Sequence, residues 1–533
     1  MTTEQKYIKN LFKNYMLPPD KIPLIVSNTL LAGYFFGDGG LAVVSFLMPV
    51  FFLFETVGFW INYGAFAKSI EAVSKNETQQ ARAYSSLALI SSMIFGVILS
   101  IIVILTFQNL IELLEIPEGL HQLAKDYGIT MAISGIFLII ASYCWQFVKM
   151  IGLQAKIRKI YVLIMLVDAL VAIICIKIFN LGIIALPIGM IGALLFVIGM
   201  SGLWFSKSFK KNLFAKIKNP VKSFLEILGA GSAASLGKFY SLFIVFFFNL
   251  VLMQNYGVKG VAVFATIQMA IRICRLHSQV TWQPISPILT MEYADKNFES
   301  MSLLMKHSLK QAIFMAVLPA IVIFFGADYF VSNSEINLSF YDFAVEAFKA
   351  YSLSVVFAAI NSIFIIWYSV INYKTLSNVL EFMRSLLLIV LFIKFTDSSL
   401  IFWSFLFAEG ITFIFVLISR FFVFKNNHQD SVFLVVDRKI GLTDENRKMI
   451  DNQEILDFVD KLLKIVKNFS DTGKNDFTSI HITNDRITLR NTGKLYDYNS
   501  NPHVKEVLQD LNSLKSYKFT FTLGMNNLYL IMN

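Results

Sequence analysis

The chain has 533 residues, of which 56% are apolar and only 15% are charged, and its mean hydropathy is +0.62. Soluble domains are about 45–50% apolar and about 25% charged, so this composition excludes a water-soluble enzyme that occupies the whole chain. The net charge of +10 would suggest nucleic acid in a soluble domain. Most of the Lys and Arg residues lie between apolar segments, however, which indicates a membrane protein with no nucleic-acid partner.

Twelve segments are apolar over roughly the 20 residues that a helix needs to cross a bilayer. They lie at 9–36, 41–67, 83–110, 123–149, 159–179, 181–205, 223–252, 258–284, 308–330, 343–372, 376–396 and 399–423. The first segment is interrupted at 18–21, so its clean apolar stretch begins only at Ile22. The pattern predicts an all-α polytopic membrane protein with twelve transmembrane helices.

The basic residues between these segments gather on one side. The gaps on the side of the two termini carry most of the Lys and Arg, whereas the opposite gaps carry little beyond Lys125, Lys177, Lys259 and Lys394. Because positively charged loops stay in the cytoplasm, we expect both termini to be cytoplasmic and the protein to lie in the cell (cytoplasmic) membrane. Membrane lipids are therefore among its expected partners.

The sequence contains an internal repeat. Residues 36–43 (FGDGGLAV) reappear as 256–263 (YGVKGVAV), and the polar segment 75–77 (KNE) is matched by 296–299 (KNFE) at nearly the same offset. Repeated halves with six spans each predict two six-helix lobes, and secondary transporters commonly bind their substrate between such lobes. The alternative is that short Gly-Ala turns recur in any helical membrane protein.

The repeat and the charge pattern divide the chain. We expect an N-terminal six-helix lobe at 1–205, a basic cytoplasmic loop at 206–222 and a C-terminal six-helix lobe at 223–425. A polar linker follows at 426–430, and residues 431–533 have the mixed composition of a small cytoplasmic α+β domain.

Two carboxyl groups lie inside predicted spans, where an ionised side chain is costly and calls for a role. Glu55 lies in span two and Asp168 in span five, and no oppositely charged residue lies within a helical turn of Glu55. Desolvation favours the protonated form of such a group, as a proton-coupling site requires. The alternative is an interhelical contact with Arg272 or Arg275, which lie three residues apart in span eight and are also candidate site residues.

Further polar residues lie in the second half. Glu381 and Arg384 are three residues apart in span eleven, so we expect them to form a local ion pair, and Glu409 lies in span twelve. Asn249 in span seven and Gln283 are candidates for hydrogen bonds to a substrate, with hydrogen bonding between helices as the alternative.

The tail after Lys425 has its own pattern. Strands are predicted at 431–437, 477–482, 486–489 and 517–523, and helices at 451–469 and 504–511. Residues 491–496 (NTGKLY) resemble the D-x-G-x-x-F box of the GHKL ATP-binding fold of anti-sigma-factor kinases, and 523–527 (LGMNN) resemble a later Gly-rich segment of that fold.

This resemblance implies nucleotide-binding positions at Asn491, Gly493 and Gly524. The box Asp is replaced by Asn491, and residues 451–469 offer no convincing Glu/Asn pair to hold Mg²⁺. We therefore expect a degenerate regulatory or docking module that binds a cytoplasmic protein partner rather than ATP.

The helical part resembles multidrug and toxic compound extrusion (MATE) transporters of the MOP superfamily. Residues 28–37 (NTLLAGYFFG), followed by Leu41-Ala42, are similar to the end of the family's first helix, with its pattern D-x-x-x-x-G-x-x-x-G and then LAA. The resemblance continues at 64–65, 75–77, Ala81, 180–183, Asn249, 283–285 and 293–294, and it covers about residues 9–424. It implies a V-shaped bundle of two lobes that exports organic molecules in exchange for H⁺ or Na⁺.

One departure from the family pattern bears on coupling. The family's first-helix Asp is matched here by Asn28, which is not ionisable and cannot accept a proton in the same way. The resemblance still predicts a multidrug efflux antiporter for a small organic or amphiphilic substrate. The alternatives are a flippase or exporter of a lipid-linked or peptidic product, and a non-transporting membrane sensor with a regulatory tail.

Enzyme signatures are missing from the sequence. It contains no P-loop, no CxxC pair, no metal-ligand spacing of histidines and no nucleophile elbow. We therefore predict no enzyme activity, no metal centre and no cofactor other than H⁺ or Na⁺ as a coupling ion.

Overall fold

The structure of the chain is a computed structural model. It describes residues 22–423 apart from 75–77, 151–153, 209–214, 216–218, 295–296, 333–340, 372 and 397–398, together with parts of 432–532. Residues 9–21 of the first predicted span, 9–36, lie outside the described residues, as do most residues of the helices expected at 451–469 and 504–511.

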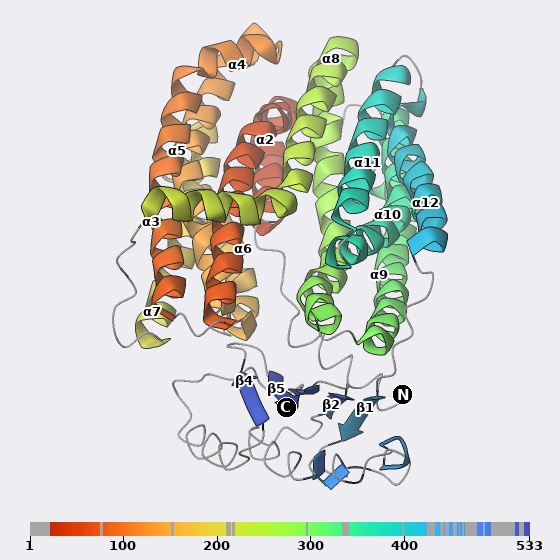
Figure 1. Cartoon of the computed structure of the whole chain (residues 1–533). Helices are drawn as coiled ribbons and strands as arrows, with labels where there is room; N and C mark the ends of the chain where they lie inside the picture. Colours follow the sequence, from red (N-terminus) through yellow and green to blue (C-terminus); the bar gives the residue numbers. More distant parts are fainter. Residues whose placement is uncertain are drawn as a thin grey trace.

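The helices form two groups, which lie on either side of the bundle in Figure 1. The first helix group consists of α2 (Ile22–Ser74), α3 (Thr78–Leu105), α4 (Phe107–Leu113), α5 (Glu118–Met150), α6 (Gln154–Lys177), the 3₁₀ turn Gly182–Ile184 and α7 (Ala185–Ser208). The second helix group consists of α8 (Pro220–Ala294), α9 (Phe298–Ser332), α10 (Tyr341–Val370), α11 (Lys374–Lys394), the 3₁₀ turn Ser399–Trp403 and α12 (Ser404–Val423). The exact boundaries of the two lobes stay predictions.

Nine helices in the described part of the chain are long and apolar enough to cross a membrane. Two of them are unusually long, because each includes a break. The apolar part of α2, Leu24–Ser69, has 46 residues, and the apolar part of α8, Ser235–Gln268, has 34 residues. At the helical rise these lengths are about 69 and about 51 Å, well above the roughly 30 Å of a bilayer core. The part of the chain before 424 is therefore an α-helical membrane region, while the count of twelve crossings stays a prediction.

Single glycines break α2 and α8 at equivalent places. Gly37 has φ 59° and ψ −153°, and Gly257 has φ 63° and ψ −161°. This conformation is nearly exclusive to glycine. Three residues later, a Cβ atom on Gly40 would overlap Phe36, and one on Gly260 would overlap Tyr256. The repeat of 36–43 in 256–263 is thus a repeat of backbone structure.

These breaks lie where the sequence predicts a boundary between spans. Separate helices were expected at 9–36 and 41–67, and again at 223–252 and 258–284. In the structure α2 and α8 each consist of two helical arms that meet in a kink at Gly37 and at Gly257, without a loop between the arms.

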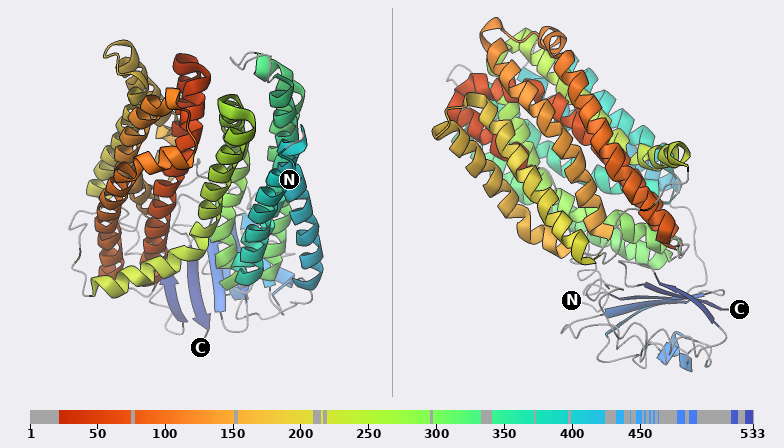
Figure 2. Two further views of the ribbon diagram at one scale, coloured as in Figure 1. Left: turned by 90° about the horizontal axis from the view of Figure 1, so that it is seen from above. Right: turned by 90° about the vertical axis from the view of Figure 1, so that its left-hand side faces the viewer.

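The start of α8 lies across the first helix group instead of running beside its own group (Figures 1 and 2). Tyr84 Oη of α3 donates a hydrogen bond of 2.6 Å to Glu226 Oε2, and Phe224 stacks on Phe95 with ring centroids 5.4 Å apart. Trp60 Nε1 of α2 donates to the carbonyl oxygen of Leu228 at 2.7 Å. The first turns of α8 are therefore fastened to the other half of the chain.

Phenylalanines fill the interior of the second helix group. Phe248 of α8 stacks on Phe392 of α11 with ring centroids 3.5 Å apart, and it also contacts Phe264 and Phe405. All but Phe405 are almost fully buried. Stacked and edge-on rings of this kind join helices tightly in an apolar interior.

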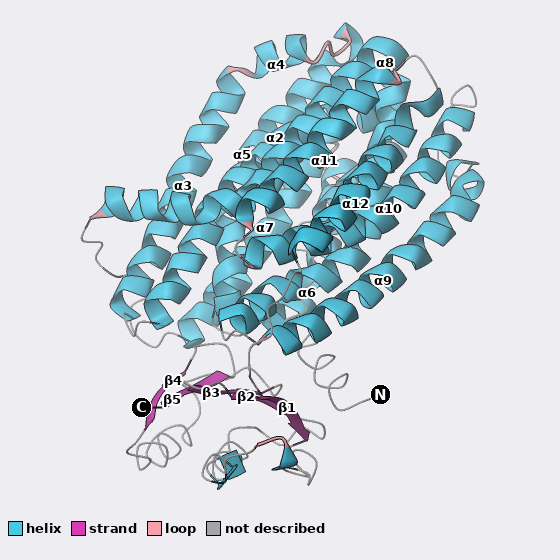
Figure 3. Ribbon diagram, turned by 45° about the vertical axis from the view of Figure 1, so that its right-hand side comes forward, coloured by secondary structure: helices cyan, strands magenta, loops and turns pink. Residues whose placement is uncertain are grey.

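The tail contains a five-stranded antiparallel sheet beside one end of the helical bundle (Figure 3). Its strands are β1 (Val432–Asp437), β2 (Phe477–Ile482), β3 (Arg486–Asn491), β4 (Tyr517–Phe521) and β5 (Asn527–Met532), in the order β1-β2-β3-β5-β4. The four predicted strands are confirmed as β1 to β4, and the sequence interpretation missed β5.

Candidate functional site

A buried polar cluster joins α2 and α6 within the first helix group. Asp168 of α6 is 0% exposed, and Asn28 Nδ2 of α2 lies 3.4 Å from its Oδ2 atom. Asn28 Nδ2 also donates a hydrogen bond of 2.8 Å to the carbonyl oxygen of Leu24, one turn earlier. Ser27 is buried beside the same carboxyl group. The structure thus brings together the two residues that the sequence named separately, Asn28 and Asp168.

Within the described part of the chain, three oxygen atoms of this cluster have no hydrogen-bond partner within normal distance and angle limits: Ser27 Oγ, Asn28 Oδ1 and Asp168 Oδ1. Buried polar atoms normally have partners, and unpaired ones are costly. An added proton or a small hard cation, which prefers oxygen ligands, would satisfy them.

A glycine on the neighbouring helix leaves space for this carboxyl group. A Cβ atom on Gly189 of α7 would lie 3.1 Å from Asp168 Oδ1 and 2.6 Å from the Asp168 carbonyl oxygen. Any larger side chain would therefore press on Asp168. The close approach of α7 to α6 explains how a carboxyl group is enclosed so completely at this point.

A second ionisable site lies where the two helix groups meet. Glu55, in the second arm of α2, forms an ion pair with Lys238 of α8. The ammonium group of Lys238 also lies 4.9 Å from the ring centroid of Phe59, one turn from Glu55. Glu55 is thus not isolated, and the sequence interpretation did not consider Lys238 as its partner. The alternative contact of Glu55 with Arg272 or Arg275 stays a prediction, because the side chains of these arginines lie outside the described residues.

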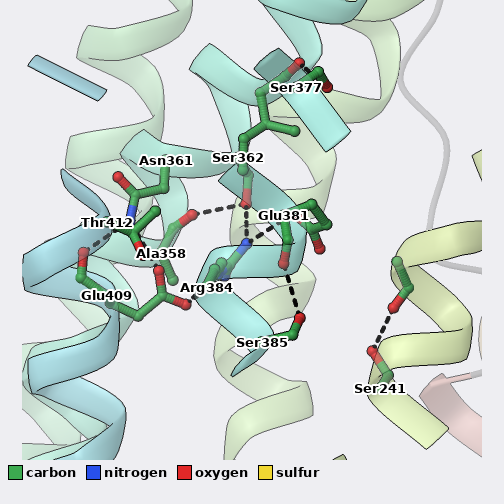
Figure 4. Close-up of polar contacts among 12 residues, drawn as sticks. Ser241, Ala358, Asn361, Ser362, Ser377, Glu381, Arg384, Ser385, Glu409 and Thr412 are labelled. Atoms are coloured by element: carbon green, nitrogen blue, oxygen red, sulfur yellow. Dashed lines mark hydrogen bonds and ion pairs between the residues drawn. The ribbon is translucent and has the colours of Figure 1, made fainter. Parts of the chain in front are cut away.

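A third network lies within the second helix group (Figure 4). Arg384 Nε of α11 donates to Glu409 Oε1 of α12 at 2.6 Å, and its Nη2 lies 2.5 Å from the same oxygen. The predicted pair of Arg384 with Glu381 is present at 3.7 Å. Glu409 is therefore the closer partner, and it lies on another helix.

Asn361 of α10 completes this network. Its Nδ2 donates hydrogen bonds of 2.9 Å to Glu409 Oε2 and to the Glu409 carbonyl oxygen, and Ser362 Oγ lies 3.5 Å from Arg384 Nη1. Glu409 is thus bound on both carboxylate oxygens, as Figure 4 shows. Such full pairing is typical of a structural group inside a membrane bundle.

Asn249 joins the helix groups near the end of α8's first arm. Ser45 Oγ donates to Asn249 Oδ1 at 2.9 Å, and Asn249 Nδ2 donates to the Ser45 carbonyl oxygen. Because both ends of this fully buried amide are used, hydrogen bonding between helices explains it better than substrate binding. Gln283, Arg272 and Arg275 lie in α8, but their side chains are outside the described residues.

Comparison with known proteins places this geometry in a known fold. Residues 25–175 match the sequence model of the MatE family, and no curated protein matches the chain. The chain is similar to an inward-facing multidrug resistance MATE family transporter of the MOP superfamily, with a TM-score of 0.64, 15% identity, and coverage of 77% of this chain and 98% of that chain. The chain has the MATE fold.

Two further structures with the MATE fold agree. An outward-facing MATE family transporter gives a TM-score of 0.63 at 15% identity, covering 79% of this chain and 96% of that chain. The MATE multidrug transporter DinF-BH gives a TM-score of 0.65 at 15% identity, covering 79% of this chain and 95% of that chain. The similarity to the inward-facing and outward-facing states of the MATE fold is nearly equal.

Several residues of these networks were missed from the sequence, among them Lys238, Ser27 and Asn361. Lys238 lies inside the predicted span seven, and a lysine in the middle of an apolar helix is itself a signal for a carboxylate partner. Ser27 adjoins Asn28 and carried no such signal. Nothing in the sequence distinguishes Asn361 from the other polar residues of α10.

The candidate nucleotide positions in the tail stay predictions. Asn491 is the last residue of β3 and pairs with Thr478 of β2. Gly493 and Gly524 lie outside the described residues. The resemblance of the tail to the GHKL fold is not established by the sheet.

Proposed function

We propose that this chain is a MATE family secondary transporter, which exports an organic solute across the cytoplasmic membrane by ion-coupled alternating access. The match of residues 25–175 to the MatE family and the MATE fold of the helices support this proposal. A multi-pass helical membrane protein without an enzyme signature agrees with it. Its substrate is a small organic or amphiphilic molecule, and its termini are cytoplasmic.

The single observation that carries ion coupling is the buried contact of Asn28 with Asp168. The family's first-helix carboxylate is missing at Asn28, but a carboxyl group from α6 lies against that position. Asp168 therefore takes over the charge-bearing role, and Asn28 and Ser27 supply neutral oxygen atoms beside it. The coupling ion is H⁺ or Na⁺, since either would neutralise the buried carboxylate.

This arrangement gives a simple coupling cycle. An ionised Asp168 without an ion is unfavourable in a fully enclosed position, so the helices around it favour opening to water. A bound H⁺ or Na⁺ removes that charge and allows α6 and α7 to close around the side chain. The ion gradient thereby biases which conformation the lobes adopt.

The test is a flux assay with purified protein in liposomes under an imposed proton or sodium gradient, with cationic dyes and amphiphiles as substrates. Wild-type protein should show gradient-driven flux, and Asp168→Asn should abolish the dependence on the gradient. Asp126→Asn is the matched control, because Asp126 lies half-buried near the start of α5 and is bound by Gln122 on the same helix. Equal gradient dependence in wild type and Asp168→Asn would remove Asp168 from the mechanism.

Two other functions remain as outcomes of this assay. Flux of a lipid-linked or peptidic product, with none of the dyes, would indicate a flippase or exporter. Binding of a solute without flux under any gradient would indicate a membrane sensor that signals through the tail. A cytoplasmic protein partner for 431–533 belongs to the proposal in either case.

A further inference from the structure

The first turns of α8 touch α2 backbone to backbone, in addition to the hydrogen bonds described above. A Cβ atom on Gly64 of α2 would overlap the carbonyl oxygen of Ile227, and one on Gly231 would overlap the carbonyl oxygen of Trp60. Small residues at a helix crossing allow such a close approach within a membrane. Because no side chain separates the two backbones, there is little room for one helix to shift against the other.

Residues 220–231, called the docked segment below, are thus fixed to the first helix group. Tyr84 and Trp60 bind this segment by hydrogen bonds. Just before it, the backbone N–H of Ala215 donates to Ser86 Oγ of α3 at 3.1 Å. By its contacts the docked segment therefore belongs to the first helix group, although it opens the second half of the chain.

The part of α8 between 235 and 256, called the upright part below, packs on the second helix group. Phe248 stacks on Phe392 of α11, and the ring centroid of Tyr240 lies 5.9 Å from that of Phe382, also in α11. Such ring contacts join helices tightly in an apolar interior. One continuous helix is therefore held at its start by one half of the chain and further along by the other half.

The helix is weak between these two parts. Residues 229–235 read GAGSAAS, so they include two glycines and no side chain larger than that of serine. Ser232 Oγ donates to the carbonyl oxygen of Gly229 at 2.9 Å, and Ser235 Oγ donates to that of Ser232 at 2.8 Å. Glycine disfavours a helix relative to alanine, and serine hydroxyl groups that bind carbonyl groups of the preceding turn often bend one.

The course of α8 agrees with a bend in this stretch. Figure 2 shows the docked segment lying across the first helix group, whereas the later part of α8 runs with the other helices of the bundle. The apolar span of α8 begins at Ser235. The backbone stays helical through 229–235, so α8 bends here without the break that it has at Gly257. Short stretches of small residues at the end of an element are typical hinges.

A movement of the two helix groups against each other must be absorbed within α8, because its two parts are fixed to different groups. We propose that residues 232–235 are the hinge, and that the docked segment moves with the first helix group while the upright part moves with the second. The hinge begins after Gly231, which is still held against Trp60. The contact of Ser45 with Asn249 opens in this movement, since it joins the upright part to α2. The proposal rests on the alternating access proposed above and names the place at which α8 bends.

The test measures distances between pairs of spin labels by double electron–electron resonance, on the full chain in nanodiscs. The three native cysteines are first replaced by alanine. Labels are then attached to cysteines at three exposed positions, which are Leu225 in the docked segment, Leu170 in α6 and Val379 in α11. Low and high pH, the presence and absence of Na⁺, and the variant Ser45→Ala with Asn249→Ala vary the balance between states.

The three distances have different expected behaviour. The distance between Leu170 and Val379 reports on the two helix groups and should change between these conditions. The distance from Leu225 to Val379 should change with it, whereas the distance from Leu225 to Leu170 should stay constant. The opposite pattern, in which Leu225 moves with Val379, would overturn the proposal. Three constant distances would overturn it as well, because no hinge then operates.

A variant with a stiffer hinge tests its position. Ser232→Ala with Ser235→Ala removes the two hydroxyl groups that bind helical carbonyl groups, so it should narrow the distances between the docked segment and α11. Ser241→Ala is the matched control, because this hydroxyl group also binds its own helix, at the Gly237 carbonyl oxygen, but beyond the hinge. The control should leave the distances as in the wild type. An equal effect of both variants would place the bend elsewhere in α8 and overturn the assignment.

Releasing the docked segment provides the converse test. Trp60→Phe with Tyr84→Phe removes two hydrogen bonds to this segment and keeps an aromatic ring at each position. The distance from Leu225 to Leu170 should then become broad. A distance as narrow as that of the wild type would contradict the role of these contacts in holding the segment.

The liposome flux assay separates this proposal from the proposed function. Gradient-driven flux together with a docked segment that moves with α11 would leave the transport function standing and remove the hinge. The expected distance changes in a protein that shows no flux under any gradient would keep the hinge and contradict transport.

Discussion

Gly37 and Gly257 lie 220 positions apart and adopt almost the same backbone conformation, with φ 59° and 63°. Each bends a long helix without a loop, and each is followed three residues later by a glycine packed against the preceding turn. The two halves of the chain are therefore built around the same bend. The conformation itself, rather than crowding, selects glycine, since a Cβ atom at either position would meet nothing within 4 Å.

Replacing either bend glycine should destabilise the protein through the backbone alone. Gly37→Ala and Gly257→Ala should each lower the free energy of unfolding by about 1–3 kcal/mol, because alanine rarely adopts this conformation. Unfolding in mixed micelles would measure the loss. Gly229→Ala is the control: Gly229 lies in α8 with open space around it and no positive φ, so its replacement should not lower stability and should raise it by up to about 1 kcal/mol, because alanine favours the helix.

The network around Arg384 should behave as a buried ion pair. Arg384→Met leaves the Glu409 carboxylate without its guanidinium partner, and we expect a loss of about 3–5 kcal/mol in stability. Replacing both residues, as Arg384→Met with Glu409→Leu, should recover a large part of that loss. Glu381→Gln serves as the comparison and should cost much less, because Glu381 lies 3.7 Å from Arg384. A double variant as unstable as Arg384→Met alone would speak against this account.

The contact of Ser45 with Asn249 should couple the two helix groups. A double-mutant cycle of Ser45→Ala and Asn249→Ala should give a coupling energy of about 0.5–1.5 kcal/mol, the range of hydrogen bonds between membrane helices. Thermal unfolding of the four proteins would measure it. Ser241→Ala is a suitable control, since Ser241 donates only to the Gly237 carbonyl oxygen of its own helix. Strict additivity of the two single changes would mean that the contact contributes nothing.

The bond from Tyr84 to Glu226 should hold the start of α8 against α3. Tyr84→Phe removes a hydrogen bond to a carboxylate and should cost about 1.5–3 kcal/mol in docking of this segment. The measurement is the rate at which a thiol reagent modifies a cysteine introduced at Leu228. This rate should be higher in the Tyr84→Phe protein than in the protein that keeps Tyr84. Tyr329→Phe, a change of the same kind on the exposed surface of α9, should leave the rate unaltered.

Repeats and local patterns were predictable from the sequence. The span boundaries near Gly37 and Gly257 were predictable because the same eight-residue pattern occurs twice, whereas the bend conformation of the glycines was not predicted. The pair of Glu381 with Arg384 was predictable because residues three apart share a helix face. The strands β1 to β4 followed from alternation. The strand β5 was missed because its residues, 527–532, directly follow a segment interpreted as part of a glycine-rich motif.

Contacts between distant helices were not predictable in the same way. Glu55 and Lys238 are 183 positions apart, and Arg384 and Glu409 are 25 apart. Which residues meet depends on how the helices cross, and an apolar helix pattern does not determine that. Asn28 and Asp168 could each be named as candidates from their types and depths, yet their contact required the fold.

The docking of α8 on α2 and α3 has a consequence for fragment complementation. Residues 224–228 belong to the second half of the chain, but Trp60, Tyr84 and Phe95 of the first half already bind them. The covalent connection before Pro220 therefore adds little to the cohesion of the assembled protein. Two co-expressed polypeptides, divided within 209–214, should find each other in the membrane and copurify as one particle.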